Sequence, residues 1–135
     1  MTFVDTNILI DIASDNPAWA DWSRQALIGA HAQGKVLFNA VVYAEFAISF
    51  ETQAECDSEI DKFDLSFVEI PKLAAFRAAQ AFRAYRRAGG ARTVVLPDFF
   101  IGAHASVLRV ALLTRDARRY RSYFPELTII APKDP

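Results

Sequence analysis

The sequence predicts an α/β fold in which a central parallel sheet of four to five strands lies between helices, giving a three-layer α/β/α sandwich. Short apolar runs alternate with longer runs of helical spacing along the whole chain. Helical runs separate the predicted strands, which is typical of parallel sheets. Of the 135 residues, 53% are hydrophobic, and no repeat or Gly-, Pro- or Ser-rich linker divides them. We therefore expect one domain over residues 1–135.

The chain opens with a predicted strand and a short helix. Residues 1–5 form a largely apolar run that ends in Asp5, and 7–13 have helical spacing up to the turn at Pro17. Tryptophan, leucine and alanine side chains then recur at helical spacing until Gly34. These patterns predict one strand and two helices before the second strand.

The second strand and its helix are predicted over residues 36–50. The strand is the apolar run 36–38, and Asn39 is a favourable N-cap residue for a helix that runs to about Phe50. An acidic surface helix is expected over 55–64.

The second half of the chain contains three further predicted strands and three helices. The long helix there is closed by Gly89 and Gly90, and Pro97 introduces the next helix. The predicted strands are 67–69, 110–114 and 127–130, and the predicted helices are 72–88, 97–108 and a short arginine-rich turn after Asp116.

The charges are divided unevenly along the chain, although the net charge is only −1. Residues 1–71 contain 3 Lys/Arg and 12 Asp/Glu, a balance of −9, and residues 72–126 contain 11 and 3, a balance of +8. Ten of those eleven bases are arginines, which suit bidentate contacts with phosphate. The pattern predicts either a phosphate-bearing partner or two halves that attract each other.

The composition also bears on the cellular compartment. The single Cys56 cannot form an internal disulfide, and no secretory signal opens the chain. The most apolar stretch, 36–50, is interrupted by Asn39 and Glu45 and is too short to cross a bilayer. We expect a soluble, cytoplasmic protein with no membrane partner.

Two acids follow predicted strands. Asp5 ends the first strand, and Asp116 comes two residues after 110–114. In parallel α/β sheets the functional site lies beyond the carboxyl ends of the strands, so the two acids are expected at one edge. Asp is also a good N-cap residue, and for each acid this structural role stays open.

Asp98 and Glu45 complete the candidate set. Asp98 begins an apolar helix, where capping alone would explain an acid. Glu45 lies in mid-helix and cannot be a cap. Its neighbours at positions i−4, i−3 and i+3 are Val41, Val42 and Ile48, so its carboxylate is expected on the stripe that faces the core. A buried carboxylate needs a metal ion or a cation such as a paired arginine.

Several carboxylates in one cleft repel one another unless a cation lies between them. Oxygen ligands of this kind select Mg²⁺ or Mn²⁺. Such ions support phosphodiester hydrolysis, because they make hydroxide available near neutral pH and stabilise the leaving oxygen. Neither histidine, His31 nor His104, is placed for a histidine-pair ribonuclease mechanism.

Four motifs occur in order along the chain: Asp-Thr-Asn at 5–7, the mid-helix Glu45, Leu-Pro-Asp at 96–98, and Leu-Leu-Thr-Arg-Asp at 112–116. Together they resemble the PIN-domain ribonucleases, and most closely the VapC toxins of bacterial and archaeal toxin–antitoxin pairs. The resemblance extends from Asp5 to Pro125 and implies a PIN-like fold. It also implies cleavage of an RNA substrate (tRNA, rRNA or mRNA), a cognate antitoxin protein and a homodimer.

The same resemblance implies roles for particular residues. The acidic quartet that would hold one or two Mg²⁺ or Mn²⁺ ions and carry catalysis is Asp5, Glu45, Asp98 and Asp116. Thr6, Asn7 and Thr114 match polar residues that support the carboxylates in the family. Some members carry a further acid or Asn two positions after the last Asp, where this chain has Arg118.

Arginines beside Asp116 and at the end of helix 72–88 are expected to contact the RNA backbone. The candidates are Arg86, Arg87, Arg92, Arg115 and Arg118. Other members of these clusters are expected to stabilise the fold, and the sequence does not separate the two roles.

The sequence fits three other kinds of protein less well. Phosphatases of the haloacid dehalogenase type have Asp-x-Asp-x-Thr or Asp-x-x-x-Thr after the first strand and a later Lys, which residues 5–9 do not match. Receiver domains need paired acids at this point, whereas Asp5 stands alone. An inactive PIN fold that binds RNA or protein is the third alternative, and the intact acidic quartet argues against it.

Overall fold

The computed structural model describes residues 1–90 and 96–133. Five parallel strands form one sheet in the order β3-β2-β1-β4-β5, with helices on both faces, so the predicted α/β class with a parallel central sheet is confirmed. The strands are β1 (Thr2–Val4), β2 (Val36–Phe38), β3 (Ser66–Phe67), β4 (Ala111–Leu113) and β5 (Ile129–Ile130). The helices are α1 (Thr6–Ala13), α2 (Ala20–Gln33), α3 (Ala40–Ala47), α4 (Gln53–Asp61), α5 (Lys72–Arg87), α6 (Leu96–Leu108) and α7 (Arg118–Tyr123).

The central strands are short and largely apolar, as is typical of strands buried on both faces of a sheet. Every residue of β1 and β2 is buried, and Phe3, Val4, Leu112 and Leu113 are completely shielded from solvent. Phe3 pairs in register with Leu37 on one side and Leu112 on the other. β1 and β4 are therefore neighbours, and the polar residues that follow them emerge together.

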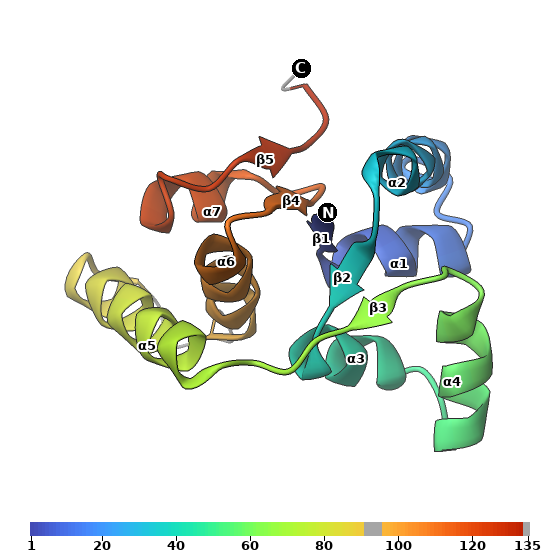
Figure 1. Ribbon diagram of the computed structural model, residues 1–135, viewed down its shortest axis with the longest axis horizontal. Coiled ribbons are helices and arrows are strands. Elements are labelled where there is room, and N and C mark those ends of the chain that lie inside the picture. Colours follow the sequence, from blue (N-terminus) through green and yellow to red (C-terminus); the bar gives the residue numbers. More distant parts are fainter. Residues whose placement is uncertain (91–95, 134–135) are drawn as a thin grey trace.

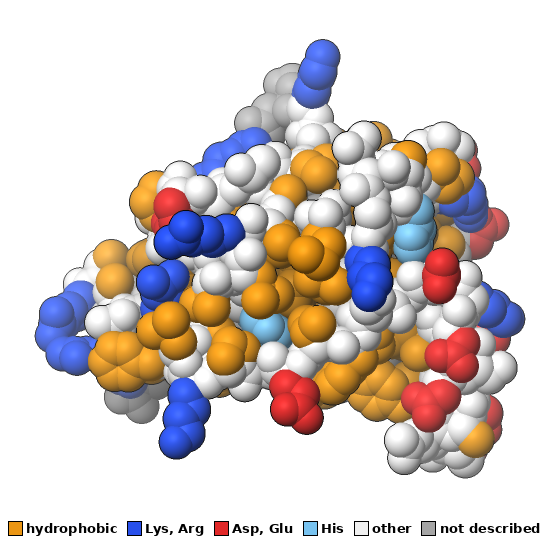
Figure 2. All heavy atoms as spheres, viewed as in Figure 1, with side chains coloured by type: hydrophobic (Ala, Val, Ile, Leu, Met, Phe, Trp, Pro, Cys, Tyr) orange, Lys and Arg blue, Asp and Glu red, His pale blue; other side chains and the backbone are white. Residues whose placement is uncertain are grey.

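The helices form two groups around the sheet. Figure 1 shows α5, α6 and α7 together at one side, where all three contact one another, and α1 packed against α2 at the other side. Figure 2 shows acidic side chains gathered over α4 and basic side chains over α5. The uneven charge of the sequence is thus also a separation in space.

A local signal explains where α3 begins. The Asn39 side chain accepts hydrogen bonds from the backbone amides of Val41 and Val42, which confirms it as the N-cap of α3. The helix is shorter than predicted, because it ends at Ala47 instead of Phe50. Ile48 is 82% exposed, so its predicted place on the buried stripe is wrong. Ile48 already lies at the C-cap, beyond the last residue with the α3 periodicity.

Within the described residues, no helix is both long enough and apolar enough to span a bilayer.

Candidate active site

A small pocket of about 180 Å³ lies at the carboxyl edge of β1 and β4. It contains the four acids that the sequence singles out, although they come from four separate segments of the chain. Its lining residues are Asp5, Thr6, Asn7, Ile10, Glu45, Asp98, Asp116, Arg119 and Tyr120.

Asp5 is held by side chains of other segments and does not cap α1. It stands at the N-cap position, but its carboxylate makes no capping hydrogen bond. Its Oδ2 atom accepts hydrogen bonds from the hydroxyls of Thr114 (2.8 Å) and Tyr120 (2.9 Å), and Asn7 Nδ2 lies 3.5 Å away. No hydrogen bond from a described residue reaches Oδ1. One oxygen of Asp5 is thus fixed, and the other is left for a ligand.

Burial strongly affects this carboxylate. Asp5 is only 5% exposed, and this burial raises its pKa from 3.8 to about 6, assisted by the nearby charges of Asp98 and Glu45 and opposed by the Thr114 and Tyr120 hydroxyls. The ionised group is therefore unfavourable in the folded chain unless a cation accompanies it.

Thr114 and Asn7 join the loop after β4 to the start of α1. Asn7 Nδ2 donates to Thr114 Oγ1 at 3.3 Å, and Asn7 Oδ1 accepts from the Arg115 backbone amide at 3.2 Å. The backbone amide of Asp116 donates to Thr114 Oγ1 at 3.1 Å. Thr114 is completely buried, so this network fixes the backbone from which Asp116 projects.

Glu45 projects from α3 into the same pocket. Its Oε1 accepts a hydrogen bond of 2.7 Å from Thr6 Oγ1, across 39 positions of sequence. Burial is the main cause that raises the pKa of Glu45, with a further contribution from the charge of Asp98 and an opposing one from the Thr6 hydroxyl. Among the described residues no arginine pairs with Glu45, so the part of the chain that the structure describes does not contain the ion pair that would give this acid a structural role.

Asp98 and Asp116 differ in their partners. Asp98 lies in the first turn of α6 and forms an ion pair with Arg119 of α7. Burial raises the pKa of Asp98, and the Arg119 guanidinium partly offsets this effect. Asp116 does not cap α7, because the N-cap residue is Ala117. Its carboxylate forms no ion pair with a described residue.

Two polar residues of the pocket, Arg119 and Tyr120, are not among the predicted site residues. Tyr120 is almost completely buried, and its hydroxyl holds Asp5, whereas the sequence indicated only an anchoring role for it. Both residues lie in the first turn of α7, three and four positions after Asp116, and from there they reach Asp98 and Asp5. That spacing is the signal by which they could have been found.

The candidate RNA-binding arginines fall into three groups. Arg115 makes a bidentate ion pair with Asp11, and its guanidinium lies 5.4 Å from the ring centroid of Trp19, which favours a structural role. Arg118 is exposed and lines a second cavity that also includes Asp116. Arg86 and Arg87 are exposed at the end of α5, and Arg92 lies outside the described residues.

The pocket chemistry fits a hard divalent cation, although the acids do not already form a metal cage. In residues 1–90 and 96–133, no group of three or more His, Cys, Asp or Glu side chains has the arrangement of a metal centre. The donors are nevertheless all carboxylate oxygens, the type that Mg²⁺ and Mn²⁺ prefer. Burial raises the pKa values of Asp5, Glu45 and Asp98, so a cation in the pocket would stabilise their ionised forms.

Replacing Arg119 by Gln should tighten Mn²⁺ binding. The Arg119 guanidinium now neutralises Asp98, so its removal leaves a more negative pocket for the ion. Both side chains are about one-third exposed (35% and 29%), so we expect a modest gain of roughly fivefold in affinity, measured by calorimetric titration at fixed ionic strength. Arg118→Gln is the matched control on the same helix. Weaker Mn²⁺ binding in Arg119→Gln than in this control would contradict the expectation.

Several solved structures share the fold of this chain. A chain of the VapBC2 complex from Rickettsia felis has a TM-score of 0.74 and 17% identity, covering 96% of this chain and 97% of that one. A toxin–antitoxin complex from Klebsiella pneumoniae gives 0.71 and 21%, with 99% of both chains covered. VapBC-1 from Haemophilus influenzae gives 0.73 and 15%, with 96% of both chains covered. A search of curated protein sequences finds no match.

The match of the sequence to a protein family is stronger evidence than the structural similarities. Residues 2–125 match the PIN domain, which is nearly the whole chain. The structural relatives share the fold over almost their entire length, in agreement with that match. The chain therefore belongs to the PIN domain family.

Proposed function

We propose that the chain is a metal-dependent endoribonuclease and the toxin of a toxin–antitoxin pair. The observation that carries this proposal is the convergence of Asp5, Glu45, Asp98 and Asp116 on one pocket at the carboxyl edge of the sheet. Membership in the PIN domain family supports hydrolysis of phosphodiester bonds. The fold shared with VapBC complexes supports a cognate antitoxin as a protein partner.

The four acids would hold one or two Mg²⁺ or Mn²⁺ ions. Such an ion supplies an activated water near neutral pH and stabilises negative charge on the reacting phosphate. The chain itself positions the donors: Thr114 and Tyr120 hold Oδ2 of Asp5, so that Oδ1 faces the pocket, and Thr6 fixes Glu45. Asn7 and Thr114 orient the loop that carries Asp116. These polar contacts are the support that carboxylate ligands need.

The RNA backbone would lie across the basic surfaces near the pocket. Asp116 and Arg118 line a neighbouring cavity that also contains Arg121 and Lys133, so positive charge begins directly beside the acids. Such contacts give affinity without sequence choice. Two further parts of the proposal are a homodimer, which the family resemblance implies, and a cytoplasmic location, which is expected from the composition of the chain.

Cleavage should require a divalent cation. We expect the purified protein to cut RNA with Mg²⁺ or Mn²⁺ and to lose this activity in EDTA, with recovery when Mn²⁺ is added in excess. Asp98→Asn should remain folded by circular dichroism and lose cleavage by at least about a hundredfold. Undiminished cleavage in EDTA would rule out the proposed mechanism. Metal binding without cleavage of any RNA would indicate the inactive, binding-only alternative.

Changing Arg86 and Arg87 together to Ala should weaken RNA binding. Both are exposed at the end of α5, and neither forms an ion pair with a described residue. If each contacts one phosphate of a single strand, the slope of log K against log salt should fall by about 1.4 in magnitude. Fluorescence anisotropy with labelled RNA in EDTA measures this slope without cleavage. An unchanged affinity and slope would assign these arginines to another role.

A further inference from the structure

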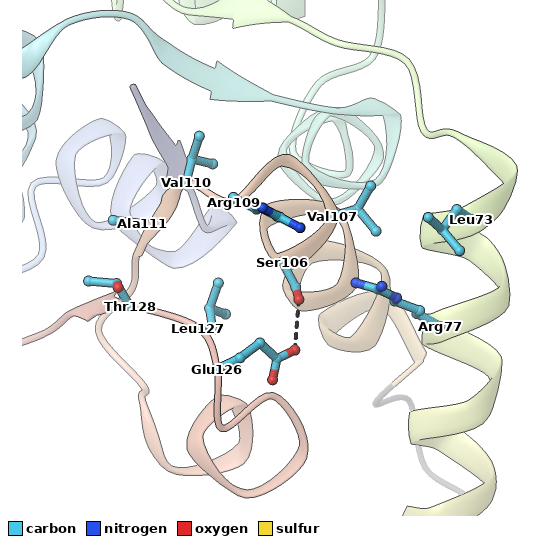
Figure 3. A pocket seen from close by; sticks show the side chains of 10 residues that line it. All are labelled: Leu73, Arg77, Ser106, Val107, Arg109, Val110, Ala111, Glu126, Leu127 and Thr128. Carbon is cyan, nitrogen blue, oxygen red and sulfur yellow. Dashed lines mark hydrogen bonds between the residues drawn. The ribbon is translucent and has the colours of Figure 1, made fainter.

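A third cavity, of about 680 Å³, lies at the amino ends of the strands, opposite the acidic pocket. It is bounded by the start of α5, the end of α6 and the segments that lead into β4 and β5 (Figure 3). Asp5 and Thr114 follow their strands, whereas Val110 and Thr128 precede theirs. The two sites therefore lie at opposite ends of the parallel strands. The lining residues are Leu73, Arg77, Ser106, Val107, Arg109, Val110, Ala111, Glu126, Leu127 and Thr128.

Two arginines supply the positive charge of this cavity. In Figure 3 the side chains of Arg77, from α5, and Arg109, directly after α6, extend toward each other. Neither guanidinium forms a hydrogen bond or ion pair with any residue in the described part of the chain. Two unpaired guanidiniums at one concave site are a strong match for a phosphate group, because each presents a planar fork of N–H donors.

Glu126 lies in the same cavity but does not neutralise these arginines. Its Oε1 accepts a hydrogen bond of 2.7 Å from Ser106 Oγ, which holds the carboxylate at the end of α6 (Figure 3). A carboxylate held in this way is an acceptor for ligand hydroxyl or amino groups. Its negative charge also disfavours a second anion. The cavity therefore has one end that can bind an anion, at the two arginines, and another that can accept hydrogen bonds, at Glu126.

Arg109 occupies a backbone position at which glycine is the usual residue. Arg109 has φ +57°, in the left-handed region, and follows the last residue of α6. The Val110 and Arg109 amides donate to the carbonyls of Ala105 and Ser106, which completes a Schellman motif. Glycine is the favoured residue at this position of the motif. An arginine here strains the backbone, which a role in ligand binding would explain.

We infer that this cavity binds a nucleoside monophosphate or a closely similar sugar phosphate. Arg77 and Arg109 would hold the phosphate, Glu126 and Thr128 would meet the sugar hydroxyls, and apolar Leu73, Val107 and Leu127 would contact the base. Its volume lies within the range of small-molecule sites, roughly 300–1,000 Å³. The site goes beyond the proposed nuclease function and does not depend on it.

The test is calorimetric titration of the whole chain with AMP in EDTA, so that a metal ion in the acidic pocket cannot bind the phosphate. We expect saturable binding of AMP, weaker binding of ribose 5-phosphate and inorganic phosphate, and no measurable binding of adenosine. Arg77→Gln and Arg109→Gly should each weaken AMP binding about tenfold, as expected for loss of a charged hydrogen bond. Arg83→Gln, which removes an exposed charge from the same helix outside the cavity, should leave AMP binding unchanged.

Arg109→Gly keeps the test independent of misfolding. Glycine relieves the left-handed strain, so this variant should have a melting temperature no lower than that of the wild type while it loses AMP affinity. Equal AMP binding in all three variants would overturn the inference. The inference would also be overturned if neither AMP nor phosphate bound. A change from dimer to monomer in Arg77→Gln would then assign the arginines to an interface between copies of the chain. Inorganic phosphate binding as tightly as AMP would overturn the nucleotide assignment.

Discussion

Replacing Asp5 by Asn should abolish RNA cleavage and, in the absence of metal, make the folded chain more stable at pH 7. Asp5 is nearly completely buried, and no described basic side chain pairs with its ionised form. Asparagine keeps an oxygen that can accept the hydrogen bonds from Thr114 and Tyr120, but it removes the negative charge that a divalent ion requires. Cleavage should therefore fall by at least about a hundredfold while the fold is retained.

The effect on stability follows from the raised pKa of Asp5. The folded chain takes up this proton at about pH 6, whereas the unfolded chain takes it up near 3.8. The contribution of Asp5 to stability is therefore full below pH 3.8 and is lost as the pH rises through 6. At pH 7 the loss amounts to roughly 3 kcal/mol as an upper estimate. Asp5→Asn should recover much of it and flatten the pH dependence over this window.

Urea unfolding in EDTA at pH 4.5 and pH 7 measures this contribution. Glu69→Gln is a suitable control, because it removes an exposed acid that pairs with no described residue. Addition of Mn²⁺ should stabilise the wild type and the control but not Asp5→Asn. If Asp5→Asn were destabilised at pH 7 and still stabilised by Mn²⁺, Asp5 would be a structural residue and not a metal ligand.

Replacing Arg115 by Met should reduce the free energy of unfolding by about 2–4 kcal/mol, the cost of leaving a buried charge without its partner. Asp11 is only 1% exposed, and both of its oxygens face the Arg115 guanidinium, at 2.8 and 3.0 Å. After the substitution, Asp11 keeps only a hydrogen bond from Ser23 and a long contact with Asn16. The pair joins α1 to the loop after β4, so its loss should loosen the segment that presents Asp116.

The neighbouring arginine provides the control. Arg118 is exposed and pairs with no described residue, so Arg118→Met should change the free energy of unfolding by less than about 0.5 kcal/mol. Adding Asp11→Leu to Arg115→Met should restore part of the lost stability, because a buried ion pair can be replaced by apolar packing. Equal stability of Arg115→Met and Arg118→Met in urea unfolding would show that the pair contributes little.

Much of this architecture is determined by local patterns that the sequence displays. The apolar runs that become β1, β2 and β4 have no competing periodicity, and Asn39 has a capping chemistry that few other residues share. Glu45 can be recognised as a site residue from the sequence, because helix capping cannot explain an acid in mid-helix. In the structure it lines the same pocket as Asp5. All the strands except β2 are shorter than predicted, and the edge strands β3 and β5 have only two residues each.

The arginine partners could not be predicted, because they depend on distances across the fold. Arg115 and Arg118 are similar in sequence context, yet one reaches Asp11 across 104 positions and the other remains exposed. Arg119 meets Asp98 only because α7 packs against α6. The role of Asp11 could not be predicted either, because an acid in a short helix is common and its burial beside Arg115 depends on the fold.

The central claim is that carboxylates from four distant segments hold a divalent ion in one pocket, and diffraction from crystals soaked in Mn²⁺ tests it most directly. Data collected near the manganese absorption edge should show an anomalous peak within coordination distance of Asp5 Oδ1 and of at least two of Glu45, Asp98 and Asp116. The same soak of Asp5→Asn crystals should show no peak there. A wild-type pocket without a peak at a Mn²⁺ concentration that supports cleavage, or a peak only at another site, would contradict the account.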